Sequence, residues 1–256
     1  MTKVALVTGG GTGIGAGIAK ALAARGVNVA INHLGDVDHD DAQQVAAACR
    51  ELGVEAVTAQ ADVGVDDECR ALVDRVSKQW GRLDYLVNNA GYSHGRPLSE
   101  LDAVEVAEFE KAFAVNCIGP FMLTRYAAPH MRAAGGGGIV NIASMAGLIG
   151  MGSSHGYCAS KAGLINLTRS LARVLGPEIR VNVICPGLVD TPFPRKVMGN
   201  RFSEVVELAA RQNVLGRILQ PEDIAVTAVF LLMDAMQITA EVVRVDGGGH
   251  LGGGIK

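Results

Sequence analysis

The stretch that decides the fold is Val4-Ala5-Leu6-Val7-Thr8-Gly9-Gly10-Gly11-Thr12-Gly13-Ile14-Gly15, close to the amino terminus. Its first four residues are apolar and predict a short strand, and the alanine-rich amphipathic segment from Ile14 to Arg25 predicts a helix. Glycine-rich turns also serve simple chain reversal, but this one lies between a strand and a helix start, where bare backbone can approach a pyrophosphate. We therefore predict a nucleotide-binding turn, whose binding residues are Gly9, Gly11, Thr12, Gly13, Ile14 and Gly15.

The same alternation of apolar runs and amphipathic stretches continues along the chain. Predicted strands are residues 4–7, 27–32, 54–58, 83–88, 138–142, 179–184 and 242–245, and predicted helices are residues 14–25, 41–52, 66–80, segments of 105–132, 157–175 and one that begins at Pro221 after a proline-rich loop. The strands are continuous β-branched runs, which is typical of a parallel sheet buried on both faces. The fold class is therefore α/β, with a single doubly wound (Rossmann) parallel sheet of about seven strands and helices on both faces. No linker divides the chain, so we expect residues 1–256 to form one domain.

Composition and charge exclude several classes of function. The chain has 23 Lys and Arg residues against 26 Asp and Glu residues, a net charge of −3 without basic clusters, so nucleic acid is not an expected partner. No apolar stretch is long enough for a signal peptide or a membrane span, so no membrane partner is expected. Five cysteines, at positions 49, 69, 117, 158 and 185, and six histidines lack metal-ligand spacing. We expect no metal, reduced thiols and a cytoplasmic location.

The second predicted strand ends in Asn32-His33, and the residues around it bear on the choice of cofactor. At this position an acid suits the free 2′-hydroxyl of an adenosine ribose, and a cation suits a 2′-phosphate. No Lys or Arg lies between Arg25 and Arg50, whereas four acids that would repel a phosphate follow the strand, namely Asp36, Asp38, Asp40 and Asp41. The sequence therefore favours NAD(H). NADP(H) is not excluded, because these acids also suit a helix start, and Asn32, His33 or Arg25 can accommodate the phosphate.

Tyr157 and Lys161 stand four residues apart, so one face of a helix carries both side chains. A phenol with an ordinary pKa of about 10 is protonated at neutral pH. A nearby ammonium group stabilises the phenolate and lowers that pKa, which favours proton exchange with an alcohol. The same spacing is common by chance, so it gains meaning only from its neighbours.

Together with these neighbours, the sequence resembles the short-chain dehydrogenase/reductase family, particularly its 3-oxoacyl-carrier-protein reductase-like branch. The resemblance spans essentially the whole chain and rests on motifs that occur in order, namely Thr8 to Gly15, Asn88-Asn89-Ala90-Gly91, Asn116, Ser144, Tyr157 to Lys161, Pro186-Gly187 and Val245-Asp246-Gly247-Gly248. It implies an NAD(P)-dependent alcohol dehydrogenase or carbonyl reductase that assembles as a homotetramer, with the C-terminal segment at a subunit interface.

The resemblance also implies roles for the motif residues. Ser144 would hydrogen-bond the substrate oxygen, and Tyr157 would exchange its proton. Lys161 would hold the nicotinamide ribose and lower the pKa of the phenol, and Asn116 would hold a water in the proton relay. Beyond the glycine-rich turn, the expected cofactor contacts are Asn32, His33, Asp62, Val63, Asn89, Ala90, Gly91, Tyr157, Lys161, Pro186, Gly187, Val189 and Thr191. Plainer alternatives exist: Ser144 capping a turn, Asn116 bonding backbone, and Asp62 as a loop acid.

The expected substrate is a small alcohol or ketone lying near Ser144, Tyr157 and residues 92–96, 148–155 and 188–202. Many of these side chains are apolar, including Leu188 and Phe193, which favours a hydrophobic or moderately sized compound. They equally suit packing against the sheet or a neighbouring subunit. The polar exceptions, His94 and His155, are predicted substrate contacts, with solvated loop histidines as the alternative. Arg96 and Arg195 suit an acidic substrate, although single loop cations are more often solvated.

Three other functions compete with this prediction. A 3-oxoacyl thioester reductase is a specific version of the same chemistry. A nucleotide-binding regulator with this fold would lack one of the four catalytic residues, and none is missing. An epimerase or dehydratase that uses the hydride transiently usually has a larger substrate domain, for which this chain is too short.

Overall fold

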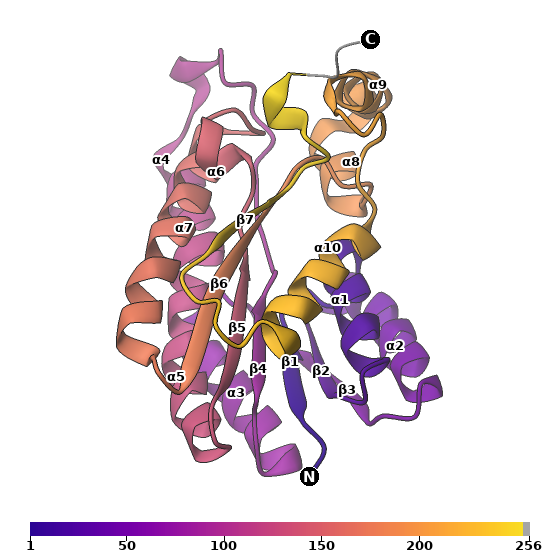
Figure 1. The fold of residues 1–256 in the computed structure, drawn as a ribbon. Coiled ribbons are helices and arrows are strands. Elements are labelled where there is room, and N and C mark those ends of the chain that lie inside the picture. The colour runs from indigo at the N-terminus through magenta and orange to yellow at the C-terminus, as the bar shows by residue number, and fades with distance from the viewer. Residues whose placement is uncertain (253–256) are drawn as a thin grey trace.

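Within residues 1–252, which the computed structural model describes except for the side chain of Val37, seven strands form one sheet, as predicted. The strand order is β3-β2-β1-β4-β5-β6-β7, and every neighbouring pair is parallel (Figure 1). The strands are β1 (Val4–Val7), β2 (Asn28–His33), β3 (Ala56–Gln60), β4 (Tyr85–Asn88), β5 (Gly137–Ile142), β6 (Ile179–Pro186) and β7 (Val242–Val245).

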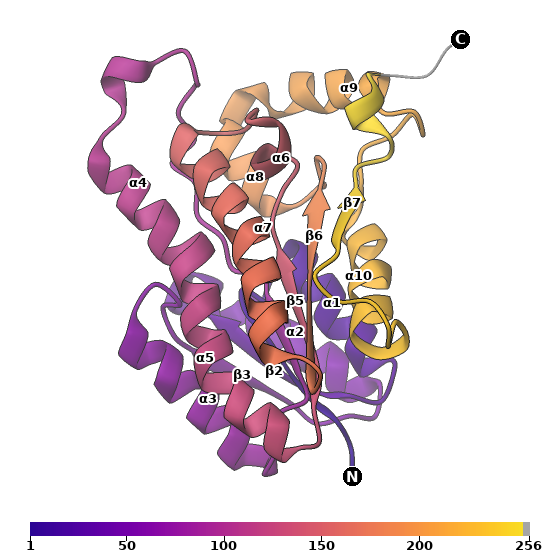
Figure 2. The ribbon, with the colours of Figure 1, turned by 60° about the vertical axis from the view of Figure 1, so that its left-hand side comes forward.

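Helices cover both faces of this sheet, and each face has its own apolar core (Figures 1 and 2). One core joins the sheet to α1 (Gly13–Ala23), α2 (Asp36–Glu51) and α10 (Pro221–Val229). The other joins it to α3 (Asp66–Trp80), α5 (Gly119–Ala133) and α7 (His155–Leu175). Strand β1 lies between them and all four of its residues are buried, which explains why its sequence is uniformly apolar.

The remaining helices are shorter. They are α4 (Val106–Phe113), α6 (Ala146–Ile149), α8 (Pro192–Met198) and α9 (Phe202–Gln212), with 3-10 turns η1 (Leu101–Ala103), η3 (Gly199–Arg201) and η5 (Gly249–Leu251) and π-helical turns η2 (Ala114–Ile118) and η4 (Phe230–Asp234). Because η2 joins α4 to α5, the predicted helical segments across residues 105–132 are confirmed. Helices α6, α8 and α9 lie beyond the carboxyl ends of the strands (Figure 1).

Two segments differ from the sequence prediction. Helix α2 begins at Asp36 instead of residue 41, because the Asp38 carboxylate accepts hydrogen bonds from the N–H groups of Leu34 and Gly35 and caps the helix start. The proline-rich segment before Pro221 contains α8 and α9 instead of a loop. Pro192 lies at the first position of α8, where its fixed φ suits a helix.

The strand order places a switch point in the middle of the sheet. The chain moves outward from β1 to β3 on one side and from β4 to β7 on the other, so the crossovers diverge between β1 and β4. Among the helices described, none combines the length and apolar character needed to cross a membrane. The predicted single domain covers residues 1–256, and its last four residues, 253–256, lie outside the described residues. They include Gly253 and Gly254.

Candidate functional site

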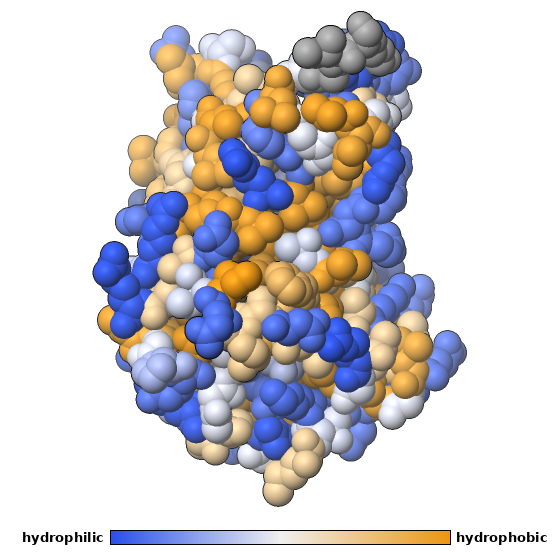
Figure 3. All heavy atoms as spheres, in the orientation of Figure 1, coloured by the Kyte–Doolittle hydropathy of each residue, from blue (hydrophilic) through white to orange (hydrophobic). Residues whose placement is uncertain are grey.

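A cavity of about 620 Å³ lies at the carboxyl ends of the strands, where the chain order reverses between β1 and β4. It extends from the glycine-rich turn and the end of β2 to the segments after β5 and β6 and to α7, α8 and α9. In Figure 3, hydrophobic side chains gather on the upper half of this face, which holds the carboxyl ends of the strands. Both the position and the volume suit a ligand site in an open α/β sheet.

The glycine-rich turn forms one wall of this cavity. Gly9, Thr12, Gly13 and Ile14 line it, whereas the two other predicted turn residues do not. Gly9 and Gly13 have left-handed φ values of +56° and +50°, which glycine adopts without strain. A Cβ at Gly13 would also stand 2.9 Å from the Cβ of Thr191, so the turn and the segment after β6 are in close contact.

Gly11 and Gly15 lie behind the turn and allow it to pack. A Cβ at Gly11 would stand 3.1 Å from the backbone nitrogen of Ala42 in α2. A Cβ at Gly15 would collide with the carbonyl oxygen of Gly9. These two glycines therefore shape the turn from outside the cavity.

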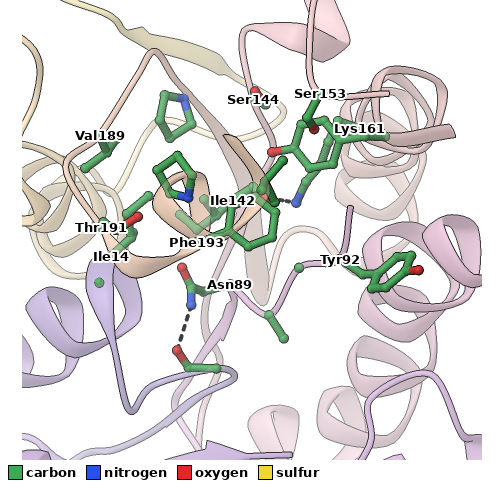
Figure 4. A pocket seen from close by; sticks show the side chains of 18 of the residues that line it. Ile14, Asn89, Tyr92, Ile142, Ser144, Ser153, Lys161, Val189, Thr191 and Phe193 are labelled. Atoms are coloured by element: carbon green, nitrogen blue, oxygen red, sulfur yellow. Dashed lines mark hydrogen bonds between the residues drawn. The ribbon is translucent and has the colours of Figure 1, made fainter. Parts of the chain in front are cut away.

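Asn89 fastens the turn to the end of β4. Its amide Nδ2 donates to the carbonyl oxygens of Thr8 at 2.9 Å and Gly9 at 3.0 Å (Figure 4). The Thr8 hydroxyl in turn accepts the N–H groups of Asn89 at 2.9 Å and Ala90 at 3.1 Å. Asn89, Ala90 and Gly91 all line the cavity, as expected. The two strands at the switch point are thus joined by a reciprocal set of hydrogen bonds.

At the end of β2, Asn32 and His33 have different positions. Asn32 lines the cavity, but its amide is occupied: Oδ1 accepts the N–H of Gly9 at 3.3 Å, and Nδ2 donates to the carbonyl of Ala61 at 3.0 Å. His33 is 3% exposed, lies outside the cavity lining and contacts the carbonyl of Gly35 through Nδ1. Both side chains are committed to local structure.

Among the four acids after β2, Asp38 alone lines the cavity. Its carboxylate caps α2 and therefore has a fixed position at this end. Arg25, which the sequence offered as a cation for a 2′-phosphate, is instead paired with Asp234 at 2.9 Å. The charge that the segment after β2 presents to the cavity is therefore the Asp38 carboxylate.

The segment after β3 carries a second charged pair. Asp62 and Val63 line the cavity, and the Asp62 carboxylate accepts from the N–H of Gly64 at 2.8 Å. Lys111 on α4 also lines the cavity and donates to Asp62 at 3.1 Å. Lys111 was not predicted, because its sequence position, in a helix that the chain reaches much later, gives no sign of contact with Asp62.

Tyr157, Ser144 and Lys161 meet at the other end of the cavity. Ser154 caps α7 by accepting the N–H of Tyr157 at 3.2 Å, which fixes the first turn of the helix. Tyr157 is half-buried, and its hydroxyl is enclosed near Ser144. Lys161 is 3% exposed, lies one turn along the helix and donates from Nζ to the carbonyl of Ile142 at 2.8 Å (Figure 4).

Burial is the largest cause of the pKa shifts of both Tyr157 and Lys161. Burial raises the pKa of Tyr157 to about 12, against a smaller lowering by the Ser144 hydroxyl. Burial also lowers the pKa of Lys161 to about 8. The Lys161 ammonium donates to the Ile142 carbonyl and lies 5.7 Å from the centre of the Tyr157 ring.

Asn116 lies in the π-helical turn η2 and is completely buried. Its Oδ1 accepts the N–H of Tyr92 at 2.8 Å, and its Nδ2 donates to the carbonyl of Tyr92 at 2.8 Å and to Ser160 at 3.0 Å. This side chain holds the segment after β4 against α7, close to Gly91 and Lys161. Ser144 likewise makes a local bond, since its hydroxyl accepts the N–H of Ala146 at 3.1 Å.

Apolar side chains surround Tyr157 on the substrate side. Leu188 and Phe193 line the cavity as predicted, and the Phe193 and Tyr157 ring centres are 6.2 Å apart. Pro186, Gly187, Val189 and Thr191, the expected cofactor contacts after β6, also line it. Helix α9 adds Val205 and Ala209, which sequence reasoning missed because it took this segment for a loop; the apolar spacing of residues 202–209 was the available signal.

The two predicted substrate histidines lie outside this lining. His94 Nε2 is 3.1 Å from the Glu108 carboxylate, and His155 Nε2 is 2.9 Å from the carbonyl oxygen of Leu98. The nearby arginines are also paired, Arg96 with Glu108 at 2.6 Å and Arg195 with Asp190 at 2.6 Å. These polar groups therefore hold loops in place around the cavity.

Comparison with known proteins gives similarities that cover nearly the whole chain. A family model described as enoyl-(acyl carrier protein) reductase matches residues 9–250. The cis-4-hydroxycyclohexanecarboxylate dehydrogenase of Sinomonas cyclohexanicum is 41% identical over 249 residues, 96% of this chain and 96% of that protein. The 3-oxoacyl-[acyl-carrier-protein] reductase of Staphylococcus aureus is 36% identical over 253 residues, 98% of this chain and 99% of that protein.

A solved structure gives the same result for the fold. The crystal structure of a protein from Burkholderia xenovorans, assigned to the short-chain dehydrogenases/reductases, has a TM-score of 0.92 and 39% identity. The match covers 98% of this chain and 99% of that one. The similarity therefore includes the sheet, the glycine-rich turn and the segments that line the cavity.

Proposed function

Because this chain belongs to the short-chain dehydrogenase/reductase family, we propose that its cavity transfers a hydride between a nicotinamide cofactor and a neutral secondary alcohol or ketone. As a member of this family, the chain is an oxidoreductase that acts on alcohols and ketones. The observation that carries the assignment of roles is that Tyr157, Ser144 and buried Lys161 line the same cavity as the glycine-rich turn.

The residues at the other end of the cavity fit a dinucleotide. Helix α1 starts at the turn with no side-chain cap and no acid in its first turn, so its N–H groups and positive dipole end can receive a pyrophosphate. Asp62 and Val63 would hold the adenine, and Gly91, Pro186, Gly187 and Thr191 would hold the nicotinamide half. When bound, the cofactor supplies or accepts the hydride, and the protein orients it.

NAD(H) is the cofactor we propose. Asp38 is held at the cavity wall by its bonds to Leu34 and Gly35, so its carboxylate would repel a 2′-phosphate and accept from a free 2′-hydroxyl. Arg25, the nearest cation suggested by the sequence, is engaged with Asp234. The name of the Staphylococcus aureus relative states the reduction of a 3-oxoacyl group, and it does not specify which cofactor this chain uses.

Tyr157 would carry the proton. With a pKa of about 12 it stays protonated at neutral pH, so it can donate to a carbonyl oxygen as the neighbouring carbon is reduced. Ser144 would hold the same oxygen through its hydroxyl. Lys161 would hold the nicotinamide ribose, and Asn116 would position this end of the cavity through Tyr92 and Ser160.

The substrate we propose is neutral. Among the described lining residues, the charged ones are Asp38, Asp62, Lys111 and Lys161, and the first three lie at the adenosine end. A free carboxylate, such as the one in the name of the Sinomonas relative's substrate, would find one lining cation among the described residues at this end, Lys161, which already donates to the Ile142 carbonyl. A 3-oxoacyl thioester remains the second candidate, because its reacting group is neutral and the Staphylococcus aureus relative is named for that reaction.

The test is a turnover assay with NADH or NADPH, following nicotinamide absorbance with ketones and with acetoacetyl thioesters. Wild type is expected to reduce at least one ketone, and Tyr157→Phe to lose about 10²-fold or more of kcat because general acid catalysis is removed. Tyr126→Phe is the matched control, since Tyr126 bonds Asp66 on the surface of α3. No turnover by wild type with any substrate, together with tight NADH binding, would favour a nucleotide-binding regulator.

The cofactor proposal has its own test. Asp38→Asn removes the charge while keeping an acceptor for the cap of α2, so kcat/KM with NADPH should rise relative to NADH by roughly tenfold, the effect of about 1.4 kcal/mol. Asp40→Asn is the control, because Asp40 lies outside the cavity lining. Strong preference for NADPH in wild type would refute the proposal.

We also propose a homotetramer in the cytoplasm. Exposed apolar side chains on α5 and α10 and their flanks, namely Ile118, Phe121, Val226 and Phe230, support association. The five cysteines are free thiols, which suits a reducing compartment. Light scattering after size exclusion should give four times the monomer mass; a monomer at micromolar concentration would overturn this.

A further inference from the structure

Ser153 lies in the cavity next to the Tyr157 end, in the short connection between α6 and α7. A Cβ on the preceding Gly152 would stand 2.7 Å from the Cβ of Ala146 and 3.5 Å from the ring of Tyr157. The backbone here therefore packs between the turn after Ser144 and the Tyr157 ring. In Figure 4, Ser144 and Ser153 are labelled at the same end of the cavity as Lys161.

The hydroxyl of Ser153 belongs to a chain of serine hydroxyls, whose contacts allow two donor directions. In one direction, Ser154 Oγ accepts from the N–H of Tyr157 and donates to Ser93 Oγ, 3.5 Å away. Ser93 Oγ also accepts the N–H of Gly95 at 3.3 Å, so both of its lone pairs are used. In this direction Ser93 donates across its 2.6 Å contact with Ser153 Oγ. Ser93 itself does not line the cavity.

In this direction the proton of Ser153 has no acceptor among the described residues, and the side chain lines the cavity. A hydroxyl that accepts from one side and donates from the other is a directed donor. The surroundings are apolar, with Met151, Leu188 and Phe193 in the same lining. A substrate oxygen that meets this donor is therefore shielded from water, which strengthens the hydrogen bond.

We propose that Ser153 determines substrate specificity by donating a hydrogen bond to a second oxygen of the substrate, separate from the one held by Tyr157 and Ser144. The substrate class is then a neutral, mainly apolar ketone that carries a further carbonyl or hydroxyl oxygen close to the reacting carbon. This inference rests on the proposed function, since it assumes that carbonyl reduction takes place at Tyr157.

The experiment compares three seven-carbon probes, 2-heptanone, 2,3-heptanedione and 2,4-heptanedione, with wild type and Ser153→Ala. The two diones place the second oxygen at different spacings. For the dione that fits, Ser153→Ala should lower kcat/KM roughly five- to tenfold more than it does for 2-heptanone, mainly through KM, as expected for one neutral hydrogen bond. Ser153→Thr keeps the hydroxyl and should restore most of this difference.

Two controls separate the outcomes. Ser93→Ala removes the neighbouring hydroxyl but leaves the Ser153 proton, so it should preserve the ratio between dione and monoketone. NADH binding, followed by fluorescence, checks that each variant keeps its fold. An equal loss for all three probes, or no loss for any, would overturn the role of Ser153. If wild type reduces none of the ketones, the proposed function fails first.

Discussion

Replacing Lys161 by Met should change how stability depends on pH. Lys161 is 3% exposed, donates one hydrogen bond to the carbonyl of Ile142, and has no carboxylate partner in the described residues. Its ammonium is therefore held in the protein at a cost in solvation, which is the cause of its lowered pKa. Methionine has a similar length and carries no charge, so it removes this cost together with the single hydrogen bond.

The magnitude follows from the two pKa values. The pKa of Lys161 is about 8 in the folded protein against 10.5 in its ordinary state. Between these values the unfolded chain binds a proton that the folded chain has lost, so the free energy of unfolding rises with pH, by at most about 1.4 kcal/mol per pH unit. From about pH 7 to pH 10, wild type should gain about 2.5 kcal/mol relative to Lys161→Met.

Urea unfolding of both proteins, at one protein concentration and across this pH range, measures the difference. The constant cost of the unpaired Ile142 carbonyl cancels, because only the change with pH is compared. Lys78→Met on the surface of α3 is the control and should give parallel pH profiles for variant and wild type. If the gap between wild type and Lys161→Met stays constant from pH 7 to pH 10, the pKa of the buried ammonium is not lowered to about 8.

Three further outcomes are expected. Alcohol oxidation should increase with pH up to at least about pH 10, because Tyr157 must lose a proton held with a pKa of about 12; a plateau near neutral pH, seen in kcat/KM, would contradict this. Gly13→Ala should weaken NADH binding, measured by fluorescence, at least about tenfold, since it combines a left-handed φ with a clash against Thr191; unchanged binding would refute it. Arg180→Met should lower the free energy of unfolding by about 2–4 kcal/mol, because buried Arg180 donates to three carbonyls around η4. A loss below about 1 kcal/mol in the same urea assay would contradict this.

The sequence predicted the sheet well because each strand is signalled locally. The first and last strands were predicted with the observed bounds, and the others start or end within a few residues of them. The start of α2 and the helices α8 and α9 were missed, although their signals are also local. Capping by Asp38 and a proline at the first position of α8 each involve only three or four residues. The surrounding residues have a composition typical of loops, which favoured the wrong prediction.

The site was harder to predict wherever it depends on contacts between distant segments. The resemblance named the residues that meet at Tyr157, but it gave no sign that Lys161 would turn to the Ile142 carbonyl or that burial would raise the phenol pKa. The pairing of Lys111 with Asp62 and the hydroxyl chain through Ser153 also join segments that are far apart in sequence. Such groups are specified by packing, which a linear pattern does not contain.

The bonds between Thr8 and Asn89 have a consequence for the order of folding. They join groups 81 residues apart, so the glycine-rich turn reaches its final form only after β4 has docked beside β1. Closing so long a loop is slow compared with forming α1, and a ribosome adds roughly 5–20 residues per second. A nascent chain would therefore carry strand β1 and helix α1 for several seconds before it can bind a dinucleotide. Any help that the cofactor gives to folding must come after the centre of the sheet has assembled.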